Sequence, residues 1–96
     1  MPLVRFSERA LSDLERLFEY LVERDPNAAI QAGARIIDAT AILADHPLVG
    51  RAVEGELREL VISYGKSGYV ALYRFLPHED RVDILSIRHP REAGFR

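Results

Sequence analysis

The fold is decided by the stretch GYVALYRF at residues 68–75. Its side chains alternate, which predicts a β-strand with Val70 and Leu72 on one face and the aromatic side chains on the other. Both faces carry few polar groups. We therefore predict that this strand, residues 69–76, is central in its sheet and covered on both faces.

Two further strands are predicted beside it, at residues 57–63 and 81–89. Short turns at residues 65–68 and 77–80 would connect them to the central strand. The second half of the chain is therefore predicted to form a three-stranded meander. A turn at residues 47–51 and an irregular segment at 53–56 would precede it.

The first half of the chain carries the signals of a strand followed by two helices. Residues 3–6 alternate and predict a short first strand. Ser7 stands at the N-cap of a helix whose apolar residues recur at spacings of three and four as far as Leu21. Asp25 and Pro26 would open a second helix, which must end near Pro47 because proline disfavours the helical conformation of the preceding residue.

The predicted element order is β-α-α-β-β-β. It corresponds to an α+β fold in which a helical hairpin packs on a mostly antiparallel sheet. With 96 residues, the chain is expected to form a single domain over residues 1–96.

Composition excludes several classes of function. The absence of cysteine excludes disulfides, a thiolate nucleophile and thiolate-bound zinc. The formal net charge of −2 is not the strongly basic balance of a surface that binds nucleic acid non-specifically. No secretory signal is recognisable, and no apolar run approaches the roughly 20 residues that span a bilayer. We therefore expect a soluble cytoplasmic domain.

Metal binding and nucleophilic catalysis have little support in the sequence. His46, His78 and His89 are not spaced as ligands on one helix, so no metal site is predicted. The run GKSG at residues 65–68 would join two strands, so it is predicted to be a hairpin turn and not a phosphate loop. No serine lies in a nucleophile-elbow motif.

Two arginines lie inside predicted strands and need partners there. Arg58 is expected to pair with Glu56, Glu59 or a helix carboxylate, and contact with a ligand is the alternative. Arg74 is expected to pair with Asp83 on the neighbouring strand.

The best functional candidate is the run RHPRE at residues 88–92, where the last strand ends. His89 could act as a general acid or base near neutral pH, and Arg88 and Arg91 could stabilise phosphoryl charge, as a ribonuclease requires. The alternative is an exposed polar end that keeps the edge of the sheet soluble.

Motifs spread over essentially the whole chain resemble the RelE/ParE superfamily, the toxins of bacterial type II toxin–antitoxin modules. They are DP at residues 25–26 with its alanine-rich helix, HPLVGR at 46–51, LREL at 57–60, GYVALYR at 68–74 and IRHPRE at 87–92. Each motif alone is weak, and the specificity comes from their number and order.

The resemblance implies one of two activities. Members of the RelE branch cut messenger RNA on the ribosome with basic residues on the middle strands and a tyrosine or histidine near the C-terminus. Here the basic positions fall on Val61, Ser63 and Val70, and the tyrosine position falls on Phe95, which has no hydroxyl. Phosphodiester cleavage would then lack a positioned base and stabilising cations. The resemblance therefore favours the ParE branch, whose members poison DNA gyrase by protein–protein contact and are not nucleases.

The resemblance also implies where the site lies. Arg88, His89, Arg91 and Phe95 are expected to contact the target. If the chain is instead a RelE-like endoribonuclease, the catalytic candidates are Arg88, His89 and Arg91. A third possibility is a homologue without toxicity that persists as an antitoxin-binding corepressor.

A partner follows from the same resemblance. A cognate antitoxin would fold along the toxin and cover apolar surface. Leu17, Tyr20, Leu21 and Val22 widen the apolar stripe of the first helix and are the predicted antitoxin-binding residues. Operator DNA would be contacted only through the antitoxin, and neither a cofactor nor a membrane is expected.

Overall fold

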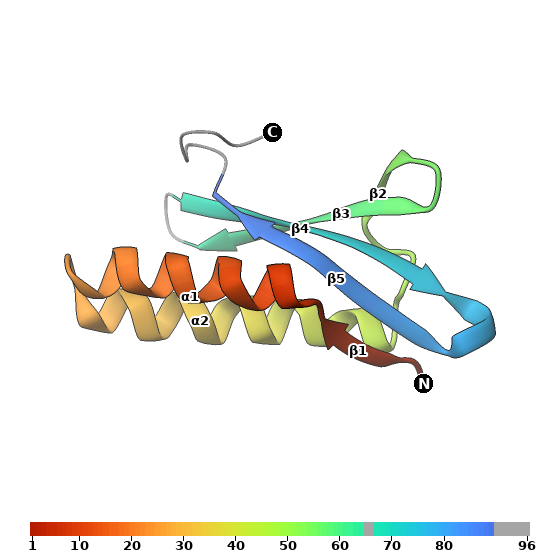
Figure 1. The fold of residues 1–96 in the computed structure, drawn as a ribbon, viewed down its shortest axis with the longest axis horizontal. Coiled ribbons are helices and arrows are strands. Elements are labelled where there is room, and N and C mark those ends of the chain that lie inside the picture. The colour runs from red at the N-terminus through yellow and green to blue at the C-terminus, as the bar shows by residue number, and fades with distance from the viewer. Residues whose placement is uncertain (65–66, 90–96) are drawn as a thin grey trace.

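A computed structural model describes residues 1–64 and 67–89 of the chain, the side chains of residues 63, 64 and 67 excepted. It contains five strands and two long helices (Figure 1). In chain order they are β1 (Leu3–Phe6), α1 (Glu8–Val22), α2 (Pro26–Ala41), β2 (Arg51–Glu54), β3 (Leu57–Tyr64), β4 (Ser67–Leu76) and β5 (Arg81–Arg88). Short 3₁₀ turns follow α2 and β4.

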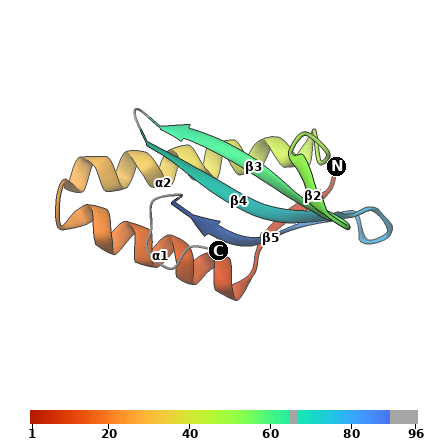
Figure 2. The ribbon, with the colours of Figure 1, turned by 90° about the horizontal axis from the view of Figure 1, so that it is seen from above.

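The strands form one sheet in the order β1-β5-β4-β3-β2, in which β1 runs parallel to β5 and the other pairs are antiparallel. The hairpin of α1 and α2 covers one face of this sheet (Figures 1 and 2). The predicted α+β fold, the meander and the central position of β4 are confirmed.

Both helices begin at the predicted caps. The Ser7 hydroxyl accepts a hydrogen bond from the amide of Ala10 at 3.0 Å, and the Asp25 carboxylate accepts one from the amide of Asn27 at 3.1 Å. The second helix ends at Ala41 and a 3₁₀ turn continues to Ala44, so the helical segment stops ahead of Pro47 as predicted.

A bulge in β5 fixes α1 to the sheet. The register between β4 and β5 shifts opposite Leu72, which leaves Leu85 between two paired residues. The Leu85 carbonyl accepts a hydrogen bond from the Ser7 hydroxyl at 3.1 Å, and the Ile87 amide donates one to the Asp13 carboxylate at 3.0 Å. Asp13 is thereby buried, at 5% exposure, in a helix whose neighbouring polar residues face solvent.

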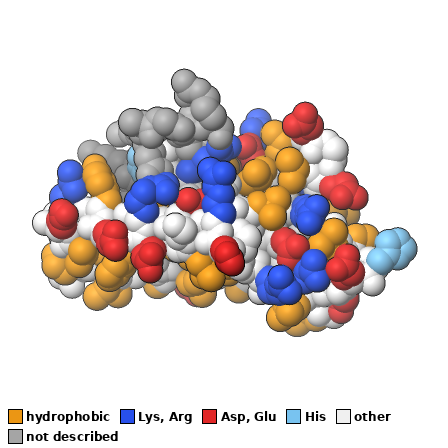
Figure 3. Space-filling view, in the orientation of Figure 1, with side chains coloured by type: hydrophobic (Ala, Val, Ile, Leu, Met, Phe, Trp, Pro, Cys, Tyr) orange, Lys and Arg blue, Asp and Glu red, His pale blue; other side chains and the backbone are white. Residues whose placement is uncertain are grey.

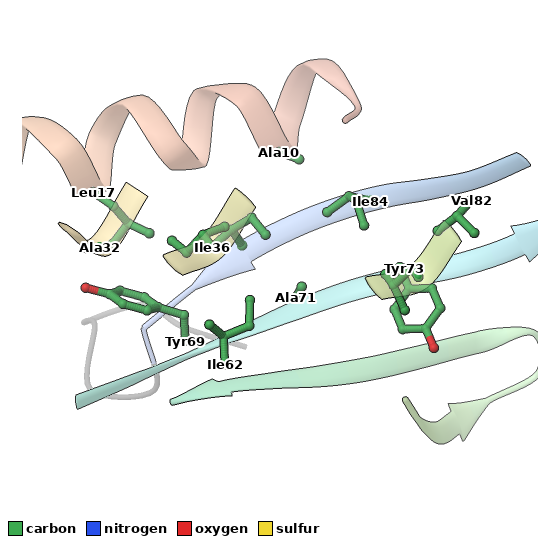
Figure 4. Close-up of a cluster of buried hydrophobic side chains, with 12 residues drawn as sticks. Ala10, Leu17, Ala32, Ile36, Ile62, Tyr69, Ala71, Tyr73, Val82 and Ile84 are labelled. Carbon is green, nitrogen blue, oxygen red and sulfur yellow. The ribbon is translucent and has the colours of Figure 1, made fainter. Parts of the chain in front are cut away.

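The core lies between the helical hairpin and the sheet (Figure 4). Its largest fully buried side chains include Tyr69 and Tyr73 from β4, Ile36 from α2 and Ile84 from β5. Tyr73 is completely buried and still has a hydrogen-bond partner, because its hydroxyl accepts from the amide of Gly50 at 2.8 Å.

Two expectations about the sheet are wrong. The central strand is covered on one face only: Val70, Leu72 and Arg74 lie half-buried on the face opposite the helices. The segment expected to be irregular contains β2, which pairs with the start of β3 through a register shift. All four residues of β2 are exposed, so no apolar alternation marks this strand in the sequence.

Of the two predicted turns, the one after β4 is confirmed as a 3₁₀ turn at Pro77–Glu79, whereas residues 67–68 of the other belong to β4. Residues 65–66 of the predicted turn between β3 and β4 lie outside the described residues, and Tyr64 pairs with Ser67 on either side of them. The other turn ends at Asp80, whose φ of 50° is in the left-handed region that aspartate tolerates. Within the described part of the chain, no helix has the length and apolarity needed to cross a membrane.

Candidate functional site

Neither helix covers the opposite face of the sheet, here called the open face (Figure 2). Directly paired residues of neighbouring strands point to the same face, so the strand register identifies its members. They include Arg5, Arg51, Leu57, Glu59, Val61, Val70, Leu72, Arg74, Arg81, Asp83, Ser86 and Arg88.

The predicted pair Arg88 and His89 is divided between the two faces of the sheet. Arg88 pairs with Val70 on the open face, where its guanidinium lies 3.8 Å from the carboxylate of Glu59. The ring of His89 packs edge-on against Tyr69, with 5.5 Å between the ring centroids. Because Tyr69 points toward the helices, the imidazole and the guanidinium do not face a common reacting group (Figure 4).

The other two members of that candidate site, Arg91 and Phe95, lie outside the described residues, as do Pro90 and Glu92. The predicted contact of Arg91 and Phe95 with the target stays a prediction.

The centre of the open face is apolar at two of the positions where the RelE-like pattern places cations. Val61 and Val70 are directly paired across β3 and β4, and Val61 is 69% exposed. The side chain of Ser63, the third such position, is not described.

An ion pair joins β2 and β3 on the open face. Arg51 donates a hydrogen bond to Glu59 at 2.6 Å across β2 and β3. Sequence reasoning missed this pair because it missed β2, and the only available signal was the opposite charge at a spacing of eight residues.

Arg74 does not make the expected pair with Asp83, although the two are cross-strand neighbours. Asp83 is instead bound by one edge of the Arg81 guanidinium through two N–H groups, with Nε–Oδ1 at 2.8 Å and Nη2–Oδ2 at 3.2 Å. This hydrogen bond raises the pKa of Arg81, and Glu79 adds to the effect from 3.0 Å. The expected Arg74–Asp83 pair is absent because Arg81, on the same strand as Asp83, already binds both oxygens of that carboxylate.

Arg58 has a structural role with partners other than those expected. Its guanidinium donates to the carbonyl of Gly50 at 2.8 Å and to that of Leu48 at 3.2 Å, and no carboxylate pairs with it among residues 1–64 and 67–89. Arg58 therefore holds the loop before β2 against the sheet by binding peptide oxygens.

The predicted antitoxin-binding residues differ in accessibility. Leu17 is 7% exposed and belongs to the core, Leu21 packs against the core and Val22 is half-buried. Tyr20 is 57% exposed, and the Arg24 guanidinium stacks 3.8 Å above its ring. The width of the apolar stripe is thus partly explained by packing, and Tyr20 is its most accessible member.

Other apolar side chains are exposed on the helical hairpin. Figure 3 shows hydrophobic groups along the lower edge, beneath a mixed band of acidic and basic groups. Leu11 and Phe18 of α1 and Ile30 and Ile37 of α2 are about half exposed or more, and each pair is spaced by seven residues. The heptad spacing is the signal that sequence reasoning could have used.

An open groove of about 630 Å³ lies between α2 and the uncovered part of β3. Arg35, Asp38, Ile42 and Val61 are among its lining residues. Among the described residues, no three histidine, aspartate or glutamate side chains are grouped so that they could hold a metal ion.

Comparison with known proteins gives consistent results. The family described as ParE toxin of type II toxin-antitoxin system, parDE, matches residues 4–94. Toxin RelE3 of Caulobacter vibrioides is 40% identical over 92 residues, which is 96% of this chain and 98% of that protein.

Two solved structures share the fold. The chromosomal ParDE toxin–antitoxin system from P. aeruginosa matches with a TM-score of 0.76 at 20% identity, over 93% of this chain and 96% of that one. The RelBE2 toxin–antitoxin complex from Mycobacterium tuberculosis matches with a TM-score of 0.62 at 28% identity, over 93% and 99%.

The fold and these similarities define the class of protein: a toxin of a type II toxin–antitoxin system, in the RelE/ParE superfamily. Within that class the chain belongs to the ParE toxin family. The resemblance recognised from the sequence motifs is confirmed.

Proposed function

We propose that this chain is a ParE-like toxin that inhibits DNA gyrase in the cytoplasm by protein–protein contact and is neutralised by a cognate antitoxin. One observation carries the proposal. At the centre of the open face, Val61 and Val70 occupy positions where a RelE-like nuclease would need cations.

The physical argument concerns the transition state of RNA cleavage. An attacking 2′-hydroxyl needs a base, and the developing phosphorane charge needs nearby cations in a fixed geometry. A valine pair supplies neither. The separation of Arg88 and His89 onto opposite faces further supports a contact toxin, because a general acid or base acts only within hydrogen-bond reach of the reacting group.

A RelE-like endoribonuclease is the second candidate, and two observations favour it. The 40% identical relative is named Toxin RelE3, and Arg88 lies directly beside Val70 of the valine pair on the open face.

The experiment that separates the two measures both activities of one preparation. Purified chain is added to gyrase and relaxed plasmid, and supercoiling and trapped cleavage complexes are measured. The same chain is added to translating ribosomes, and messenger RNA ends are mapped. Inhibited supercoiling with intact transcripts is expected, whereas transcript cuts at discrete sites with normal supercoiling would assign the RelE-like activity. Inactivity in both assays, together with normal growth on expression, would identify a corepressor.

Histidine variants sharpen the test. His89→Ala is expected to retain full toxicity, since a contact toxin uses no proton transfer, whereas a nuclease that relies on His89 would lose about 100-fold or more of its rate. His78→Ala is the matched control, because His78 is exposed in the 3₁₀ turn after β4. A large loss for His89→Ala alone would contradict the proposal.

The antitoxin is proposed to cover the exposed apolar part of the helical hairpin around Tyr20, and to contact operator DNA on behalf of the complex. The ParDE and RelBE2 structures are toxin–antitoxin complexes and support an antitoxin partner. The target is proposed to contact the end of β5, at Arg88 and His89 and, beyond the described residues, at Arg91 and Phe95.

A further inference from the structure

Arg74 occupies the middle of a row that crosses the open face. The register places Arg5 of β1, Asp83 of β5, Arg74 of β4 and Leu57 of β3 side by side. The row continues to Glu54 of β2, which pairs with Leu57, so it contains two arginines and two carboxylates. Asp83, the carboxylate next to Arg74, is engaged by Arg81, and Leu57 separates Arg74 from Glu54.

Arg81 binds two carboxylates beside Arg74. Its guanidinium holds Asp83 through two hydrogen bonds and lies 3.0 Å from Glu79. No hydrogen bond or ion pair to Arg74 is present within residues 1–64 and 67–89, and its Nε is a buried donor without an acceptor. Both carboxylates nearest to Arg74 are therefore held by Arg81, and Arg74 has no counter-ion among residues 1–64 and 67–89.

A buried donor that lacks an acceptor is unfavourable by about 1–3 kcal/mol, and more when the group is charged. If a binding partner supplies an anion, the charge of the Arg74 guanidinium is compensated in the complex with that partner. An arginine presents its remaining N–H groups as a planar fork that fits a carboxylate or a phosphate.

The surroundings of Arg74 distinguish these two anions. Leu57 lies opposite Arg74 on β3, and Leu72 and Leu76 lie two residues away on the same face of β4. The aromatic side chains of β4 offer no surface for base stacking on the open face, because Tyr69 and Tyr73 are buried in the core and Phe75 packs against it. An anion embedded among leucines fits an acidic side chain on an apolar protein segment better than it fits RNA.

We infer that Arg74 is a carboxylate-binding site that anchors an acidic, otherwise apolar segment of the antitoxin on the open face of the sheet. The inference rests on the proposed function in one respect, that an antitoxin neutralises this chain. The leucines would pack against the apolar side chains of the segment, and Arg74 would pair with its aspartate or glutamate. Arg5, exposed at the edge of the same row, adds positive potential that attracts the acidic partner.

The anion site is tested on the full chain by NMR of the arginine Nε–Hε groups. Propionate, a carboxylate with an apolar tail, and inorganic phosphate are titrated separately. The Arg74 signal is expected to shift saturably with propionate, with a dissociation constant about tenfold lower than that of Arg35, an exposed arginine of α2. Equal, non-saturating shifts at Arg74 and Arg35 would overturn the site. Tighter saturation by phosphate would assign it to nucleic acid instead.

The nature of the partner is tested by selecting peptides from a random 12-residue display library on the full chain. Acidic residues flanked by apolar ones are expected among the selected sequences, and Arg74→Gln is expected to abolish the acidic enrichment. Arg35→Gln is the matched control. Arg74→Lys shows whether a positive charge without the planar guanidinium is sufficient for the acidic enrichment. Circular dichroism confirms that each variant folds. Selection without acidic enrichment, or enrichment that survives Arg74→Gln, would refute the inference. Neither readout depends on toxicity or gyrase, so failure here and failure of the proposed function are distinguishable.

Discussion

Gly50 and Gly33 allow one chemical change, glycine to alanine, to be tested with opposite expected signs. A Cβ atom added at Gly50 would lie 2.6 Å from the Cε1 and the hydroxyl oxygen of Tyr73 and 2.7 Å from the carbonyl oxygen of Glu59. A Cβ atom added at Gly33 would meet nothing within 4 Å outside its own helix.

The cost at Gly50 can be worked from these contacts. Tyr73 is fully buried and the oxygen of Glu59 belongs to the backbone of β3, so neither can move aside freely. Overpacking of this kind costs about 1–3 kcal/mol. Displacing the Gly50 amide from the Tyr73 hydroxyl, now at 2.8 Å, costs about 1 kcal/mol more. Gly50→Ala is therefore expected to lower the free energy of unfolding by about 2–4 kcal/mol.

Gly33 lies inside α2, where alanine restricts the unfolded chain without a clash. Gly33→Ala is expected to raise the free energy of unfolding by about 0.5–1 kcal/mol.

The assay is urea unfolding of both variants followed by circular dichroism. With a slope of about 1–3 kcal/mol per molar urea, the midpoint for Gly50→Ala should fall by on the order of 1 M or more. The midpoint for Gly33→Ala should rise slightly. If the free energy of unfolding of Gly50→Ala lies within about 0.5 kcal/mol of that of the original protein, the packing argument is refuted. So small a change is typical of exposed positions and is incompatible with contacts this short.

Two further stability predictions concern charged groups. Asp13→Ala should lower the free energy of unfolding by about 2–3 kcal/mol, because it leaves the Ile87 amide without an acceptor. Asp13→Asn keeps an acceptor and should lower the free energy of unfolding by less. Equal losses for the two variants in urea unfolding would contradict this prediction. Arg51→Gln should change the free energy of unfolding by less than about 0.5 kcal/mol despite the short hydrogen bond to Glu59, because the Arg51 side chain is 77% exposed. A loss above about 1 kcal/mol in urea unfolding would show that this ion pair is stronger than exposed pairs usually are.

The separation of Arg88 from His89 shows why adjacent residues are a poor guide to a site on a sheet. Side chains of consecutive residues in a strand point to opposite faces. Sequence proximity at the end of β5 suggested a combined acid–base and phosphate site, whereas the strand geometry puts the two groups on opposite faces.

The sequence alone was sufficient for the elements with strong local signals. Ser7, Asp25 and Pro26 mark helix starts because capping chemistry acts within one turn of the chain. The alternation in β4 and the order of motifs were sufficient to predict the sheet and the toxin superfamily, since periodicity reflects which face is buried.

Only the tertiary structure decided how strands and charges pair. The exposed strand β2, the bulge that lets Asp13 bind the Ile87 amide, and the capture of Asp83 by Arg81 all depend on residues that meet through register. A carboxylate between several arginines pairs with whichever guanidinium the backbone brings nearest, and this is a distance that local sequence does not encode. For the same reason Arg74, which has no acceptor for its Nε among the described residues, became recognisable only after its neighbours' partners were known.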